Sequence, residues 1–242
     1  MLDYNPEFSY EDKCVGEKCL IDYKNAYQEF NADLKSFIIS PGSISNQYII
    51  QTGQSSFLDF GGTTEPKTAT VEFYVGGASD EQAHENISNL FLACKECILK
   101  RELHRFEYPA LLTGKNVEET GVEPYYLVTL DFIVVQRLPL VSADISEPAI
   151  IYNEGNIPSG VRYILKPPIN ISSFNINGIK VTNLHAGKNF IIDGISGKIT
   201  ENGNNRFAST DIIDFPKIFP GKNEINMSYN IPVTVEYYPL FE

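Results

Sequence analysis

The sequence predicts a mainly β protein of two domains with one main helix. Val, Ile, Thr, Tyr and Phe dominate its apolar runs, and these residue types favour strands. The first half contains one stretch of helical periodicity, whereas beyond residue 145 a turn signal recurs about every ten residues, which is typical of a β-sandwich or jelly roll. With 242 residues, 43% of them hydrophobic, the chain is long enough to bury the cores that this fold needs.

The first domain is expected to contain five strands. They have alternating or β-branched composition and span 34–40, 46–52, 68–75, 106–112 and 125–136. The stretch 68–75 alternates most cleanly, as a half-buried strand does, and Pro41-Gly42 ends the first strand. Residues 53–66 are too many for a tight hairpin turn, so we predict a projecting arm or long functional loop there.

The helix is predicted from capping residues and an apolar stripe. Ser79 or Asp80 is expected to cap it, and acidic residues in its first turn suit the helix dipole. The apolar residues then recur at spacings of four and three, which places them on one face: Ala83, Ile87, Leu90, Cys94 and Cys97. This pattern predicts a helix that ends at about Leu99 or Leu103.

The domain boundary is predicted within 137–148, where two prolines interrupt the periodicity. We therefore expect domains at 1–144 and 145–242. The net charge of −12 divides unevenly, with −11 on the first domain and −1 on the second. Such acidity disfavours binding to nucleic acid through phosphates. No apolar run is long enough for a membrane span, and the polar N-terminus has no signal-peptide features, so synthesis in the cytosol is expected.

The cysteines raise the question of a metal site. Two close pairs, Cys14 with Cys19 and Cys94 with Cys97, could together make a tetrahedral zinc site. Because Cys94 and Cys97 fall on the apolar stripe, burial as small hydrophobic side chains is favoured instead. Cys14 and Cys19 could close a small disulfide loop in air, but a cytosolic product would keep them reduced. We expect no bound metal and no cofactor.

No catalytic residues are predicted. Three histidines, His84, His104 and His185, are dispersed, and no Gly-x-Ser-x-Gly motif accompanies them. The pairs Glu118-Glu119 and Asp211 with Asp214 are expected to be solvated or turn-forming, so a hydrolase is the least favoured function. Four tyrosines could stack against sugar rings, although tyrosines in strands are more often buried. They are Tyr152, Tyr163, Tyr237 and Tyr238.

The C-terminal half resembles the distal tail protein (Dit) family of long, flexible-tailed phages of Gram-positive hosts. The similarity is best over 150–242 and rests on element order over 1–144. It is carried by Asp193-Gly194, by Gly-Lys-Ile-Thr-Glu-Asn-Gly at 197–203, by Asp-Ile-Ile-Asp-Phe-Pro at 211–216, by Phe-Pro-Gly-Lys-Asn at 219–223 and by Val-Glu-Tyr-Tyr-Pro at 235–239. The resemblance implies an N-terminal β-sandwich or barrel-like domain with a helix and a long hairpin arm. It implies a galectin-like or carbohydrate-module-like β-sandwich after it.

The resemblance also implies a function. Six copies would form a ring at the tail tip of a phage, a prophage particle or a tail-like bacteriocin. The ring would join the tail tube protein to a tail-associated fibre or lysin protein, with a receptor-binding protein as a further partner. The arm would contact a neighbouring copy through Phe57, Leu58 and Phe60. Six N-terminal domains of charge −11 would keep DNA phosphates from sticking to an acidic lumen. The alternative is an adhesion protein whose C-terminal sandwich binds host cell-wall sugars.

Overall fold

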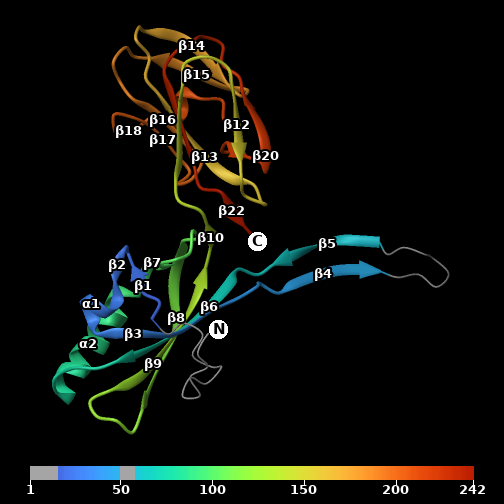
Figure 1. Ribbon diagram of the computed structural model, residues 1–242. Helices are drawn as coiled ribbons and strands as arrows, with labels where there is room; N and C mark the ends of the chain where they lie inside the picture. The colour runs from blue at the N-terminus through green and yellow to red at the C-terminus, as the bar shows by residue number, and fades with distance from the viewer. Residues whose placement is uncertain (1–15, 50–57) are drawn as a thin grey trace, which may run out of the picture. The chain divides into compact units, whose positions relative to one another are not determined.

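The computed structural model describes residues 16–49 and 58–242 (Figure 1). The chain forms two compact units that divide between Gln136 and Arg137. We predicted the boundary after residue 144. It lies earlier because β11 (Val141–Ile145) pairs along its whole length with β21 (Val233–Tyr237), which makes it part of unit 2. Within the described ranges, no helix is long and apolar enough to cross a membrane.

Unit 1 is built on a seven-stranded antiparallel sheet in the order β2-β1-β7-β8-β9-β6-β3. Its strands are β1 (Cys19–Ile21), β2 (Lys24–Asn25), β3 (Ala32–Ser40), β6 (Lys67–Val75), β7 (Glu96–Arg101), β8 (Tyr108–Glu119) and β9 (Tyr126–Val134). The alternation of β6 and β9 points Phe73, Leu130 and Phe132 to one face, where all three are fully buried. The mainly β fold class is confirmed.

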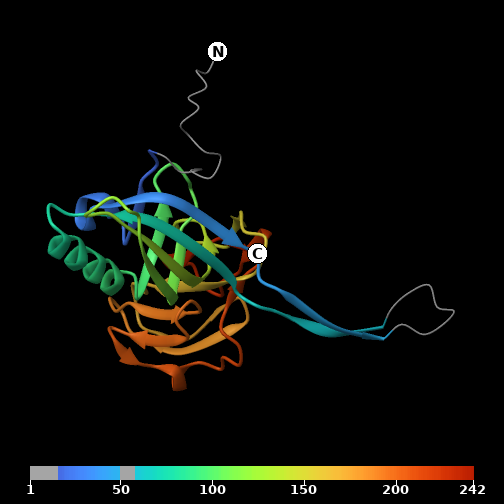
Figure 2. The same ribbon diagram turned by 90° about the horizontal axis from the view of Figure 1, so that it is seen from below.

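Helix α2 (Asp80–Ala93) covers the apolar face of this sheet, and its buried Ile87 and Leu90 belong to the same hydrophobic core (Figure 2). Ser79 is the N-cap, because its side chain accepts a hydrogen bond from the Gln82 N–H at 3.2 Å. The predicted helix end was wrong. The helix stops at Ala93 with Cys94 as its C-cap, and Cys97 lies in β7, where alternate residues are buried in the sheet.

A second, shorter helix escaped the sequence analysis. α1 (Ala26–Phe30) has one turn and no long apolar stripe. The Asn25 side chain caps it by accepting a hydrogen bond from the Tyr27 N–H at 3.0 Å, and Asn31 ends it with φ 49°. Asparagine adopts the left-handed conformation more readily than most residues, so Asn31 is a suitable residue to end a helix. This single capping residue is a weak sequence indication of so short a helix.

Unit 2 contains strands, turns and one short 3-10 helix, η1 (Phe207–Ser209). Its main sheet has the order β11-β21-β13-β16-β17-β18, with β19 also paired to β13. Two separate ladders, β12–β20 and β14–β15, accompany it. The remaining strands are β12 (Ala149–Asn153), β13 (Ser159–Leu165), β14 (Ile171–Ile176), β15 (Ile179–Leu184), β16 (Phe190–Asp193), β17 (Lys198–Glu201), β18 (Asn204–Asn205), β19 (Lys217–Ile218), β20 (Gly221–Ile225) and β22 (Leu240–Phe241); β10 (Gln136–Arg137) lies at the unit boundary. One core, centred on β13, β16 and β21, holds this unit together.

Candidate assembly surfaces

The predicted arm is a two-stranded hairpin formed by β4 (Ile44–Ile49) and β5 (Leu58–Thr64). We predicted a strand over 46–52 and a projecting arm or long loop over 53–66, and the resemblance implied a long hairpin arm. The hairpin arm is observed, and its second strand begins at Leu58. Leu58 and Phe60 lie in β5, while Phe57 lies outside the described residues. Both views show the hairpin extending away from the sheet of unit 1 (Figures 1 and 2).

The arm continues the ladder that joins β3 to β6. Ser40 pairs with Thr68 at the end of that ladder, and Ile44 pairs with Thr64 at the start of the next, so the register is the same on both sides of the break. The interruption coincides with two prolines, Pro41 and Pro66, which have no N–H to donate to a ladder. One long hairpin therefore supplies both an edge of the sheet and the arm.

The base of the arm depends on close contact between its two strands. A Cβ atom at Gly42 would lie 1.7 Å from the backbone oxygen of Glu65, so only glycine fits there. The Glu65 N–H donates to the Ser43 oxygen at 2.9 Å, and the Ser43 hydroxyl donates to the Glu65 carboxylate. These contacts bring the two ends of the arm together.

We expect Gly42→Ala to open the base of the arm. The added Cβ collides with a backbone atom, which cannot rotate away, so the free energy of unfolding should fall by about 1–3 kcal/mol. Hydrogen exchange of residues 40–44 and 65–68, with thermal unfolding of the full chain, measures the effect. Ser43→Ala removes only a hydroxyl contact and should cost less than Gly42→Ala; an equal or larger cost would contradict the steric explanation.

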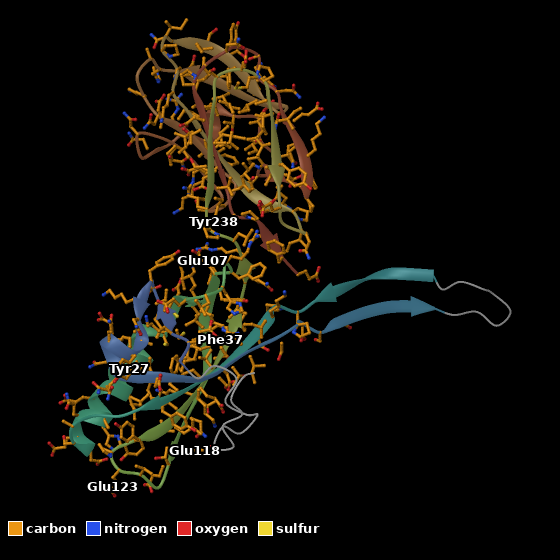
Figure 3. The ribbon with its side chains drawn as sticks, in the orientation of Figure 1. Tyr27, Phe37, Glu107, Glu118, Glu123 and Tyr238 are labelled. Atoms are coloured by element: carbon orange, nitrogen blue, oxygen red, sulfur yellow. The ribbon has the colours of Figure 1, made fainter. Side chains whose placement is uncertain are left out.

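The end of unit 1 that contains the β8–β9 turn is acidic. The β8–β9 turn and the first turn of α2 bring together Asp80, Glu119 and Glu123 around a shallow depression, and Glu118 and Glu123 mark this end in Figure 3. The Tyr126 hydroxyl donates to Asp80. This hydrogen bond, then desolvation, then the charges of the nearby carboxylates raise the pKa of Tyr126 to about 12. These carboxylates give this end of unit 1 a local group of negative charges.

In unit 2, a buried carboxylate joins three segments of the chain. Glu201 ends β17 and is 5% exposed. Its carboxylate accepts hydrogen bonds from Arg206 Nη1 at 2.6 Å and from His185 Nδ1 at 2.8 Å. Arg206 also donates to the Ser209 hydroxyl at 2.9 Å and to the Asn183 carbonyl at 3.0 Å. The cluster ties the β14–β15 ladder and η1 to the main sheet.

A second ion-pair group crosses three neighbouring strands of unit 2. Arg162 on β13 donates to Asp193 on β16 at 2.9 Å and to Glu236 on β21 at 3.1 Å. Burial alone would raise the pKa of Asp193, but hydrogen bonds from Ser196 and Arg162 outweigh it and hold that pKa below its ordinary value. For Glu201, burial is likewise outweighed by the His185 hydrogen bond and the Arg206 charge, and its pKa is lowered.

We expect these two lowered pKa values to make unit 2 acid-sensitive. A carboxylate with a depressed folded pKa stabilises the fold above its unfolded pKa and loses that contribution as the pH falls through the folded pKa. The unfolding temperature should therefore be flat above about pH 5 and should fall below about pH 4. Calorimetry across this range checks it. Glu201→Gln should have a shallower acid slope than the wild type; identical slopes would contradict the assignment.

We compared the sequence and the fold of this chain with those of known proteins. No protein-family model and no curated protein matches the sequence. Among solved structures, the Dit protein of phage SPP1, described as a paradigm of the hub adsorption apparatus of phages that infect Gram-positive bacteria, matches with a TM-score of 0.73 at 12% identity, over 93% of this chain and 99% of that one. The chain has the Dit fold. The predicted resemblance to distal tail proteins is confirmed at the level of fold.

Two further solved structures match the fold of this chain. They are the phage P2 baseplate in its activated conformation with Ca and with Sr, with TM-scores of 0.57 and 0.56. Each is 10% identical and covers 87% of this chain and 91% of that chain. Both units of this chain are needed for such coverage, so the match concerns the whole arrangement of elements along the chain.

The cysteines of this Dit fold do not form a metal site in the described part of the chain. Cys94 and Cys97 are buried and close together, as the hydrophobic interpretation predicted, with the Cys97 thiol 3.9 Å from the Cys94 carbonyl oxygen. A hydrogen bond from Cys97, then burial, raises the pKa of the Cys94 thiol. Cys19 is buried on β1, and Cys14 lies outside the described residues.

The histidines and tyrosines are scattered over the Dit fold. His84 lies 3.7 Å from Asp80 on α2, His104 lies 3.7 Å from Glu17, and His185 belongs to the cluster in unit 2. Tyr163 and Tyr237 are 1% exposed, which removes them as sugar-stacking platforms, whereas Tyr152 is 69% exposed. Tyr238 packs beneath the Arg137 guanidinium at 3.8 Å from the ring centroid. No sequence signal pointed to Glu201 and Arg206, because strand pairing alone brings them to His185.

Proposed function

We propose that this protein is a structural component of a phage tail tip, in an infectious phage, a prophage particle or a tail-like particle. Six copies form a ring that joins the tail tube protein to a tail-associated fibre or lysin protein. The observation that supports this most is the structural match with SPP1 Dit, which has a TM-score of 0.73 and spans 99% of that chain. The named baseplate structures support the same location.

Unit 1 closes the ring, and the arm contacts the neighbouring copy through Phe57, Leu58 and Phe60. A two-stranded hairpin on its own is marginally stable in water, so this arm gains stability from a partner. The same unit carries the acidic excess of the chain. Placed toward the lumen, its carboxylates repel DNA phosphates and let the DNA pass; a lumen lined instead by Lys and Arg would contradict this part of the proposal.

Unit 2 points outward and offers a surface to a receptor-binding protein. Its charge is close to balanced, and several of its large apolar side chains are exposed, including Ile150, Tyr152 and Phe219. The proposed role is architectural and involves no catalysis, cofactor or specific nucleic-acid contact. The protein is made in the bacterial host cytoplasm and resides at the tail tip.

Negative-stain electron microscopy of the purified chain tests this function. We expect closed rings of six copies around a central opening, alone or after addition of the tail tube protein. Addition of that protein should stack tube density on one face of the ring. Filaments, or isolated single copies under both conditions, would contradict the proposal.

A further inference from the structure

Two thiols lie against each other at the junction of α2 and β7. Cys94 is the C-cap of α2, and Cys97 is the second residue of β7, so only Lys95 and Glu96 separate them. The Cys97 thiol lies 3.9 Å from the Cys94 carbonyl oxygen and also hydrogen-bonds the Cys94 side chain. Neither residue is in a disulfide. The two sulfur atoms thus already meet inside the core of unit 1.

The geometry of a disulfide selects this pair. A disulfide requires Cα atoms within about 7 Å of each other and side chains directed toward one another. Because their thiols are in contact, Cys94 and Cys97 need only a small adjustment of the turn to reach bonding distance. Cys19, the other cysteine of the described residues, pairs by register with Arg101, four residues further along β7 than Cys97. That offset is roughly 13 Å along a strand, which is too long for a bond between Cys19 and Cys97.

The turn between the two thiols lies at the surface, although the thiols themselves are buried. Lys95 and Glu96 are exposed, and so is Leu92 in the last turn of α2. The Lys95 N–H donates to the Leu92 oxygen at 3.4 Å, a long hydrogen bond that holds the helix end weakly. Helix ends of this kind fray and open locally. Each opening gives a small oxidant access to the thiols without unfolding the sheet.

The surroundings favour a lasting disulfide over a catalytic one. Redox enzymes stabilise a thiolate by placing the cysteine at the N-terminus of a helix. Cys94 is instead at the C-terminus of α2, where the helix dipole is negative, and the Cys97 hydrogen bond and burial raise the pKa of its thiol. A disulfide whose reduced form has no stabilised thiolate is a poor oxidant, so this bond persists once it has formed.

We propose that Cys94 and Cys97 form a disulfide when the protein leaves a reducing compartment, and that this bond fastens the end of α2 to β7. The inference rests on the proposed function only for the place of oxidation. Synthesis in the host cytoplasm keeps the thiols reduced, and release of the particle exposes them to oxidant.

A low-molecular-weight disulfide such as oxidised glutathione supplies the oxidant. The thiolate of Cys97, the more exposed of the two residues, attacks one sulfur of glutathione disulfide and releases the first glutathione thiolate. The sulfur of Cys94 then attacks Cys97 and releases the second. The two glutathione thiolates take up the two protons that the cysteines lose. Two protein thiols are oxidised, and one glutathione disulfide is reduced to two thiols.

Oxidised glutathione tests the inference on the purified full chain. Trypsin cleaves after Lys95, so after incubation at about pH 8 and alkylation of remaining thiols the bond should join two peptides in mass spectrometry. Oxidation should also raise the unfolding temperature by about 2–6 °C. Cys97→Ala should show neither change. The matched control Cys19→Ala removes another buried cysteine of the same unit and should show both. Circular dichroism verifies that both variants fold.

Refolding tests the same pairing without the protection that burial gives. A chain refolded from denaturant in an excess of oxidised over reduced glutathione samples every pairing, including those of Cys14, and the bond between Cys94 and Cys97 should again be the main product. A folded chain that keeps both residues as free thiols, or that pairs other cysteines instead, overturns the inference and leaves the proposed ring untouched. Equal unfolding temperatures before and after oxidation overturn the claim that the bond fastens α2. A monomeric chain that forms the bond overturns the ring alone.

Discussion

Removing the arm should abolish ring assembly and leave unit 1 folded. Replacing residues 44–64 with a short Gly-Ser linker is compatible with the fold, because the two ends already meet where the Glu65 N–H donates to the Ser43 oxygen at 2.9 Å. We therefore expect native circular dichroism and an unfolding temperature close to the wild type, with only the single-chain mass in native mass spectrometry.

The β8–β9 turn provides the control for the arm deletion. Replacing residues 120–123 with a similar linker alters another projecting hairpin of the same unit but leaves the β4–β5 ladder intact. This control should still assemble. An arm-deleted chain that forms rings at wild-type concentrations would show that the arm does not join neighbouring copies.

Arg206→Ala should destabilise unit 2 more than any surface substitution. It removes the guanidinium 2.6 Å from Glu201 and leaves that carboxylate buried with only His185 as a side-chain partner. Breaking a buried ion pair by removing one partner typically costs about 3–5 kcal/mol. The hydrogen bonds to Ser209 and Asn183 are lost as well, so η1 should be held less firmly against the end of β15. Chemical denaturation of the full chain measures the loss.

An exposed ion pair of the same unit provides the control for Arg206→Ala. Lys222 lies 3.4 Å from Glu224, and both side chains are more than half exposed. Lys222→Ala should therefore cost less than about 1 kcal/mol. Equal losses for Arg206→Ala and Lys222→Ala would show that the Glu201 cluster does not hold unit 2 together.

The sequence allowed good prediction where the signal is local. The alternation of 68–75 and the Ser79 cap with the stripe Ala83, Ile87 and Leu90 both correspond to observed elements. The same periodicity misled beyond Cys94, because a helix ending there and a strand that buries Cys97 produce the same spacing of three. The strand β7 is stabilised by pairing with β8, a contact that no local pattern reveals.

Features that depend on distant pairing escaped prediction. The unit boundary is set by β11 pairing with β21, two strands some ninety residues apart in sequence, which places 141–144 in unit 2. The strand at Leu58–Thr64 contains two glycines, a composition more typical of a loop than of a strand. It forms a strand because the register of the β3–β6 ladder continues into the arm. Glu201 and Arg206 meet His185 for the same reason, since strand order brings them together.

The mass of the assembled protein tests the account most directly. Native mass spectrometry of the full chain, alone and with the tail tube protein, should show a species of six times the 27.1 kDa of one chain. It should also show that this species is lost when the arm is deleted. A wild-type protein that remains at 27.1 kDa under both conditions, at the highest concentration reached, would contradict the ring on which the proposed function rests.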